Sequence, residues 1–309
     1  MTIAPCIVGI DVSKQWLDCF FHPAGRRCRF ANDAQGHDGL VALLATQESF
    51  CVLEATGPYD RSLCLRLHDE SQPFHRANPR KARQFAKAAG FLAKTDRVDA
   101  CMLARYGAAM SLPAEARPQP ARQALRDLMA RRDQLVEMRK GERTRLAQPH
   151  ADWLEESLRQ MIDALDRQIE AVEARIDALM ASSRRLLAQK ALLCSAPGVG
   201  PVTAKVLLAH MPELGHRDRR AIGALAGLAP LSCDSGAMHG RRCIWGGRKR
   251  VRDALYMAAL AACRCAPFKA VSQAMRDRGK PAKLVIIAIA RRLLVALNAL
   301  LRDNRTFQP

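Results

Sequence analysis

The sequence predicts an α/β domain with a mixed sheet, then a long helical region and a mainly α-helical C-terminal domain. Three observations support this. Short apolar runs alternate with helical patterns over residues 1–115. Leucine, isoleucine and valine then recur in steps of four and three from 158 to 179, the heptad repeat of a helix that packs against another helix. Beyond a proline-broken linker and this helical region at 116–188, residues 189–309 show mostly helical patterns.

The first domain is expected to begin with three consecutive strands. Residues 6–12, CIVGIDV, are apolar and rich in β-branched side chains, and WLDCFF and RCRF follow at hairpin-like intervals. FCVLEAT and PFHRAN are further short strand patterns, and helical patterns at 36–47, from Pro58 and at 80–89 separate or follow them. This alternation predicts an α/β layout with a mixed sheet.

Four acids are the first candidates for chemistry. Asp11 and Glu54 lie at the carboxyl ends of predicted strands, where α/β sheets collect reactive groups. Asp96 and Asp99, in the stretch KTDRVDA, open a helical pattern and fall on one face of it. Converging carboxylates suit Mg²⁺, and phosphoryl transfer on nucleic acid commonly uses two such ions roughly 4 Å apart. Each acid alone has a simpler explanation, as a helix cap, a turn residue or an ion-pair partner, but together they favour a metal site.

The charge of the chain indicates a polyanionic partner. Lysine and arginine number 49 against 30 acids, a formal net charge of +19, and such a surface neutralises phosphates and releases their counterions. Nucleic acid is the leading candidate. The apolar run at 284–301 contains Arg291 and Arg292 and is predicted to be too polar to span a membrane. The first residues run directly into a strand pattern, so we expect a cytoplasmic protein, with its eleven cysteines reduced.

The helical parts leave two alternatives open. A break at 148–150 can reverse the chain, so a helical hairpin within one chain and a coiled coil between chains fit the heptad pattern equally well. Gly198 and Gly200 lie in a Gly-x-Gly turn between apolar helices, as in a helix-hairpin-helix whose N–H groups bind phosphate, although a plain turn is the alternative. The last helix is expected to bury Leu284, Ile287, Ala288, Leu294, Leu297 and Leu301.

Ser235, in the loop DSGAMHG, is the second candidate for chemistry. A serine beside a glycine can attack a phosphodiester if a base removes its proton, and Asp234 and His239 are its nearest titratable neighbours in sequence. Six basic residues without one acid follow it: Arg241, Arg242, Arg248, Lys249, Arg250 and Arg252. They are candidates to clamp DNA or RNA phosphates. From these residues alone, a turn serine next to phosphate-binding arginines is the favoured interpretation.

An ordered set of motifs carries a family resemblance. GIDVSK, LEATGPY, KTDRVDA, APGVGPVTA, ALAGLAP, DSGAMHGRRCIWGGR and RDALYMAAL occur in this order over almost the whole chain. The set resembles the DEDD transposases of bacterial insertion sequences, the insertion-sequence one-ten family, which includes the Piv-type invertases. The resemblance implies an RNase H-like (RuvC-like) N-terminal domain, a coiled-coil region and a C-terminal transposase domain.

The resemblance also implies an activity. It assigns the four family acids to Asp11, Glu54, Asp96 and Asp99, as ligands of two Mg²⁺ ions for which Mn²⁺ can substitute. It assigns the family serine to Ser235, which implies a covalent phosphoserine link to cleaved DNA. The implied partners are DNA at the element ends and target, a bridge RNA, and further copies of the chain in a dimer or tetramer. Two alternatives stay open: a RuvC-like endonuclease that uses water, and a non-catalytic DNA- or RNA-binding protein.

Overall fold

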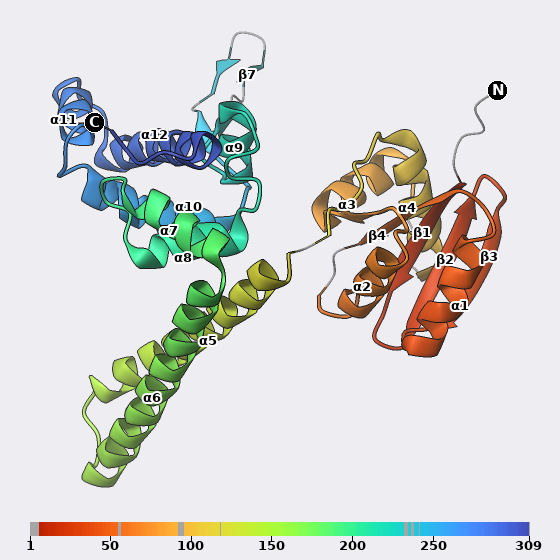
Figure 1. The fold of residues 1–309 in the computed structure, drawn as a ribbon, viewed down its shortest axis with the longest axis horizontal. Helices are drawn as coiled ribbons and strands as arrows, with labels where there is room; N and C mark the ends of the chain where they lie inside the picture. The colour runs from red at the N-terminus through yellow and green to blue at the C-terminus, as the bar shows by residue number, and fades with distance from the viewer. Residues whose placement is uncertain are drawn as a thin grey trace. The chain divides into compact units, whose positions relative to one another are not determined.

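The computed structural model describes residues 6–54, 57–91, 96–117, 119–231, 234–235, 238–240 and 242–308. The side chains of residues 96, 97, 234, 235, 238 and 239 are outside that description. The chain forms two compact units, Met1–Arg117 and Pro118–Pro309 (Figure 1).

The first unit is built on a five-stranded mixed sheet. Strands β1 (Cys6–Val12), β2 (Trp16–His22) and β3 (Arg26–Ala31) form an antiparallel meander. Strand β4 (Ser49–Glu54) pairs parallel with β1, and β5 (Phe74–Ala77) pairs parallel with β4. The strand order is therefore β3-β2-β1-β4-β5. The α/β layout and the mixed sheet predicted from the sequence are confirmed.

Helices cover both faces of this sheet. The four helices are α1 (Ala34–Leu44), α2 (Arg61–Asp69), α3 (Pro79–Ala88) and α4 (Asp96–Ala109). Val8 and Ile10 of β1 share a buried cluster with leucines of α1 and α2. Val52 of β4, on the opposite face, shares a cluster with residues of α3 and α4. Successive side chains of a strand point to opposite faces, so α1 and α2 cover one face and α3 and α4 the other.

Glycine allows α4 to lie directly on β1. A Cβ atom on Gly9 would overlap the carbonyl oxygen of Ala100 and lie 2.5 Å from the backbone nitrogen of Ala104. A Cβ atom on Gly107 would lie 2.8 Å from the side chain of Ile7. Ala100 therefore lies over Gly9 and Gly107 over Ile7, so α4 runs antiparallel to β1. The first turn of α4 consequently lies toward the carboxyl end of β1.

The second unit is mainly α-helical. Its helices are α5 (Pro120–Leu146), α6 (Asp152–Ser182), α7 (Arg184–Cys194), α8 (Pro201–His210), α9 (Arg219–Leu225), α10 (Lys249–Ala262), α11 (Phe268–Asp277) and α12 (Ala282–Asp303). Two short antiparallel strand pairs lie between α9 and α10. They are β6 (Pro230–Leu231) with β9 (Cys243–Ile244), and β7 (Asp234–Ser235) with β8 (Met238–His239).

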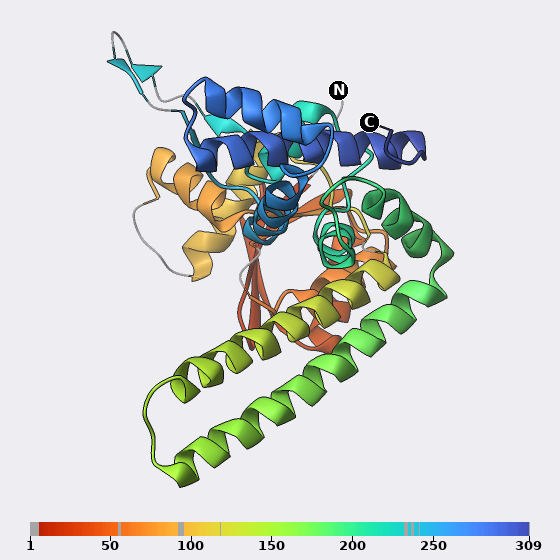
Figure 2. The same ribbon diagram turned by 90° about the vertical axis from the view of Figure 1, so that its left-hand side faces the viewer.

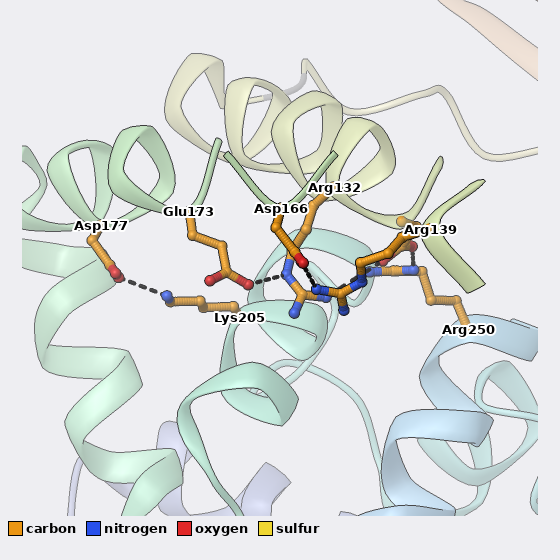
Figure 3. Close-up of polar contacts among 8 residues, drawn as sticks. Arg132, Arg139, Asp166, Glu173, Asp177, Lys205 and Arg250 are labelled. Atoms are coloured by element: carbon orange, nitrogen blue, oxygen red, sulfur yellow. Dashed lines mark hydrogen bonds and ion pairs between the residues drawn. The ribbon is translucent and has the colours of Figure 1, made fainter. Parts of the chain in front are cut away.

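Helices α5 and α6 form an antiparallel hairpin within one chain (Figures 1 and 2). The predicted heptad positions are buried or half-buried along α6, and Leu165 and Ile169 pack with Leu135 of α5. Arg132 of α5 pairs with Glu173 of α6 at 2.6 Å, and Arg139 pairs with Asp166 (Figure 3). Of the two arrangements that the sequence left open, this chain has the helical hairpin.

The hairpin shares a core with the C-terminal helices. Leu125 and Met129 of α5 and Ile176 of α6 belong to the same buried cluster as the apolar faces of α8, α10 and α12. Lys205 of α8 also pairs with Asp177 of α6 at 2.6 Å, and an ion pair joins Arg250 of α10 to α5 (Figure 3). The second unit therefore includes the helical region together with the C-terminal helices.

Helix α12 corrects two expectations. Its buried side chains include Val285, Ile286, Ile289, Ala290, Leu293, Leu294 and Leu297, because α12 packs against helices on more than one side. The predicted apolar face was therefore right only in part, since Leu284 is 48% exposed. Of its other members, Leu294 and Leu297 are buried, and Ile287 and Leu301 are half-buried against the core. By length and composition α12 could also cross a membrane, despite its two arginines, but half of its apolar window is buried inside the unit. It is the core helix of this unit.

The contact between β1 and α4 gives a first prediction. Gly9→Ala should destabilise the first unit by about 1–3 kcal/mol or more, since the added methyl group overlaps backbone that cannot move independently. Urea denaturation of the full chain, followed by circular dichroism, measures this loss. Gly39→Ala is the control, because its methyl group meets only the Phe30 ring edge at 3.3 Å. Equal stabilities of the two variants would contradict the close-contact account.

Candidate active site

Two of the predicted acids lie at the carboxyl ends of neighbouring parallel strands. Ile10 of β1 pairs with Leu53 of β4, so Asp11 and Glu54 are the next residues on adjacent strands. Both lie two residues beyond positions that face α4, namely Gly9 and Val52. By strand periodicity their side chains are on the α4 face of the sheet. Both are half-buried.

A third acid reaches the same end of the sheet from α4. Asp99 is half-buried and precedes Ala100, the residue that lies over Gly9. Glu54 and Asp99 line one cavity of about 560 Å³. Asp11 is not part of that lining, although its strand position is next to Glu54. The structure thus brings an acid from the sheet and an acid from the helix to one cavity, as the sequence pattern suggested.

Asp96 begins α4, as the sequence predicted, but its side chain is outside the described part of the chain. Among the side chains that are described, no three His, Cys, Asp or Glu residues group as a metal site. The two cavity-lining donors are carboxylates, the ligands preferred by hard divalent cations such as Mg²⁺. The donor chemistry present at the cavity therefore fits such an ion.

Basic residues of α3 form another wall of this cavity. Arg80, Arg83 and Lys87 line it together with Phe91. The three cations recur at steps of three and four residues, which places them on one face of the helix. They were not among the predicted site residues, although their spacing is a visible signal in the sequence. A cavity with carboxylates on one side and cations on the other suits a bound cation together with a phosphate group.

The side-chain amide of Asn32 ties together the loops that follow β1 and β4. Its Nδ2 donates to the carbonyl oxygen of Ser13 at 2.7 Å and to that of Tyr59 at 3.1 Å. Its Oδ1 lies 2.8 Å from Nε2 of His37. Because the Asn32 amide nitrogen is the donor in both backbone bonds, its oxygen accepts, and His37 donates. Burial lowers the pKa of His37, which favours its neutral form.

Asp60, six residues after Glu54, has a different environment. It is 1% exposed and accepts a hydrogen bond of 2.7 Å from Nε of Arg76 on β5, while its Oδ1 has no hydrogen-bond partner. Burial and this carboxylate raise the pKa of the neighbouring Cys64 thiol to about 12. Asp60 therefore links the start of α2 to the sheet. The ten cysteines in the described part of the chain are all free, as predicted.

Ser235 lies in the second unit, in the hairpin formed by β7 and β8. Ser235 pairs with Met238, and Asp234 pairs with His239. Their side chains are outside the description. The hairpin projects beyond the helices of its unit (Figures 1 and 2). In the sequence, β6 precedes the hairpin and β9 follows it, and these two strands pair with each other. Asp234 and His239 thus pair with each other across this hairpin, next to the pair that contains Ser235.

The basic run after Ser235 is divided between internal and exposed positions. Arg248 pairs with both carboxylate oxygens of Glu213 at 2.6 Å. Lys249 pairs with Asp253, Arg250 with Asp133, and Arg252 donates to the carbonyl oxygen of Gly246. Arg242 is exposed, and Arg241 is outside the described residues. Four of the six side chains thus have partners within the unit, and their binding of DNA or RNA stays a prediction.

The Gly-x-Gly turn connects α7 to α8, so it has a helix on each side, as the sequence predicted. Gly198 has a φ of +80°, and a Cβ atom there would lie 2.6 Å from the backbone nitrogen of Ala262 on α10. Gly198 is therefore required by conformation and by packing. Gly200 caps α8 and has open space around its Cα atom. Phosphate binding by this turn stays a prediction.

Comparisons with known proteins identify relatives of the whole chain. A pilin gene-inverting protein of Moraxella bovis is 30% identical over 315 residues, which cover 97% of each chain. The pilin gene-inverting protein of Moraxella lacunata is 30% identical over 318 residues, again 97% of each chain. A putative transposase, y4rJ, of Sinorhizobium fredii is 35% identical over 114 residues, 35% of this chain and 29% of the relative.

Family models cover both units. The model for DEDD transposases of the IS110 type matches residues 8–149, and the model described as transposase of the IS116/IS110/IS902 family matches residues 190–273. Together with the full-length relatives, these matches define the class: the chain is a DNA transposase or recombinase. It belongs to the IS110 family of DEDD transposases.

The bridging role of Asn32 gives a second prediction. Asn32→Ala removes the donor to both loops, and each lost hydrogen bond costs about 1 kcal/mol. Amide hydrogen exchange at residues 13–16 and at 57, 59 and 60 should therefore accelerate about tenfold. Asn78→Ala is the control, since it removes the cap of α3 and no contact to either loop. Unchanged exchange in Asn32→Ala would contradict this role.

His210 gives a prediction about pH. Burial, with the nearby charges of Arg126 and Arg248, lowers the pKa of His210 from 6.5 to about 4. Between these two values the unfolded chain binds more protons, so this contribution to stability is complete above pH 6.5 and decreases as the pH falls toward 4. His210→Gln should flatten that decrease in urea denaturation of the second unit. The same pH dependence in wild type and variant would contradict the assignment.

Proposed function

We propose that the protein moves its own insertion sequence by cutting and rejoining DNA strands in a Mg²⁺-dependent reaction, through a phosphoserine intermediate on Ser235. Asp11, Glu54, Asp96 and Asp99 hold the metal. The observation that carries the proposal is the cavity that Glu54 and Asp99 both line, with Asp11 on the strand beside Glu54. The family assignment supports DNA as the substrate.

The proposed reaction conserves the energy of the phosphodiester. The Oγ atom of Ser235 forms a bond to phosphorus, the bond from phosphorus to one sugar oxygen breaks, and that sugar hydroxyl is released. A sugar hydroxyl of the recombining strand then attacks the phosphoserine and displaces Oγ. The bound metal supplies positive charge that stabilises the negative charge developing on the phosphate oxygens. The reaction requires the serine and the carboxylates to act on the same phosphodiester.

The proposed partners follow from the same chemistry. The DNA substrates are the ends of the element and a target, and an element-encoded bridge RNA selects them by base pairing. The net charge of +19 supports binding of both nucleic acids. We propose that the protein acts in the cytoplasm as a dimer or tetramer. The two full-length relatives are named for inverting pilin genes, and inversion uses the same cutting and rejoining of strands.

The test uses DNA from the flanks of the element, the adjacent noncoding RNA, and Mg²⁺. Wild-type protein should form a covalent adduct with DNA, and Ser235→Ala should form none. Glu54→Gln and Asp99→Asn should each lower the rate at least about 100-fold, the usual cost of removing one group that stabilises transition-state charge. Asp69→Asn and Ser182→Ala are the controls, because both residues are exposed and distant in sequence from the proposed site.

Two results would contradict the proposal. Continued DNA nicking by Ser235→Ala would identify an endonuclease that uses water as its nucleophile. Full retention of every activity in Glu54→Gln and Asp99→Asn, with and without Mg²⁺, would identify a non-catalytic nucleic-acid-binding protein. Its acids would then serve only as helix caps and ion-pair partners.

A further inference from the structure

The second unit contains a groove that none of the assigned roles uses. It has a volume of about 1020 Å³ and is formed by residues of α9, the segment around β6 and β9, α10 and α12. This groove is separate from the carboxylate cavity, which belongs to the first unit. Its lining combines many cations with an apolar floor, so its chemistry points to an amphipathic anion.

Six basic side chains line the groove, and no acidic side chain does among the residues that the structure describes: Arg219, Arg220, Arg242, Lys283, Arg291 and Arg292. None of them forms an ion pair within the part of the chain that the structure describes. This contrasts with Arg248, Lys249 and Arg250, which are paired within the unit. Asp218, the acid just before α9, accepts hydrogen bonds from backbone N–H groups of that helix. Arg220 also interacts electrostatically with this carboxylate. The described lining itself holds cations from separate segments and no acid, which favours a chain of phosphates.

The floor between these cations is apolar. Leu284, Ile287 and Val295 of α12 contribute to it, with Ile244 of β9 and the half-buried ring of Tyr256 from α10. Leu284 is 48% exposed in this unit. Phosphates alone cannot cover such a surface, and the outside of a duplex presents phosphates and sugars with its base faces stacked inside. Unpaired nucleotides present both phosphates and free base faces.

In the sequence, some residues that line the groove are adjacent to the hairpin that carries Ser235. Pro230 is in β6, Ile244 is in β9, and Arg242 immediately precedes β9. Lining residues therefore flank the hairpin of β7 and β8 on both sides in the sequence. A strand bound in the groove would be held by the same segments that hold Ser235. Binding there would therefore position nucleic acid relative to the serine loop.

We propose that this groove binds an unpaired segment of nucleic acid, with phosphates on the six cations and base faces on the apolar floor. The inference rests on the proposed function for its biological role, because strand exchange requires DNA to be unpaired. Binding itself requires neither Mg²⁺ nor Ser235. The groove and the catalytic proposal can therefore be tested separately.

The experiment measures fluorescence anisotropy of a labelled 20-nucleotide oligothymidylate and of a 20-base-pair duplex, with the full chain in EDTA. Arg220→Ala/Arg292→Ala removes two exposed groove cations. It should weaken binding of the single strand at least tenfold and lower the slope of log affinity against log salt by about 1.4, since each phosphate contact on a single strand contributes about 0.7. Arg167→Ala/Arg175→Ala is the matched control, as it removes two exposed cations from α6.

The apolar floor is tested by Leu284→Ser, a change at an exposed position that leaves the core intact. It should reduce the preference for the single strand over the duplex and leave the salt slope unchanged. Equal single-strand affinity in the wild type and the groove double variant would overturn the proposal. So would a change in oligomeric state, measured by light scattering, without a change in affinity, because the groove would then be a protein interface. If the groove binds the single strand but the wild-type protein does not cut DNA, the catalytic proposal is contradicted and the groove proposal stands.

Discussion

The close contact between α4 and β1 determines the arrangement of the first unit. Because Gly9 has no side chain, the backbone of α4 at Ala100 lies directly against the strand. That contact fixes which end of α4 lies near the carboxyl ends of β1 and β4. Asp99 is one residue from the contact, and Asp11 is two residues from Gly9. The absence of a side chain at Gly9 thus sets the position of Asp99 on α4 relative to Asp11 on β1.

The second unit depends on a different constraint, the burial of α12. Its apolar side chains on several faces pack against α7, α9, α10 and α11, all earlier in the chain, and share a buried cluster with residues of the α5 and α6 hairpin. The surface that α12 leaves uncovered, around Leu284 and Ile287, is bordered by cations that form no ion pair among the described residues. The same helix therefore provides both the core of this unit and the floor of its basic groove.

Much of the first unit could be predicted from local sequence. The strand that ends near Asp11, the strand that ends at Glu54 and the helix that begins at Asp96 all follow from patterns within a dozen residues. What local patterns could not provide was the contact between distant segments. Arg248 and Arg250 were predicted to bind phosphates, yet their partners, Glu213 and Asp133, lie far earlier in the chain. The apolar stripe predicted for α12 was incomplete for the same reason, since a helix packed on several sides also buries residues outside one stripe.

The central claim is that the acids on β1, β4 and α4 hold a divalent metal ion. Electron paramagnetic resonance of Mn²⁺ titrated into the full chain tests it most directly, without DNA or RNA. The account predicts that the wild type binds Mn²⁺ and that Glu54→Gln/Asp99→Asn loses this binding, while Asp69→Asn/Glu70→Gln, with the same loss of charge on the exposed end of α2, retains it. Equal Mn²⁺ binding by the wild type and both double variants would contradict the claim.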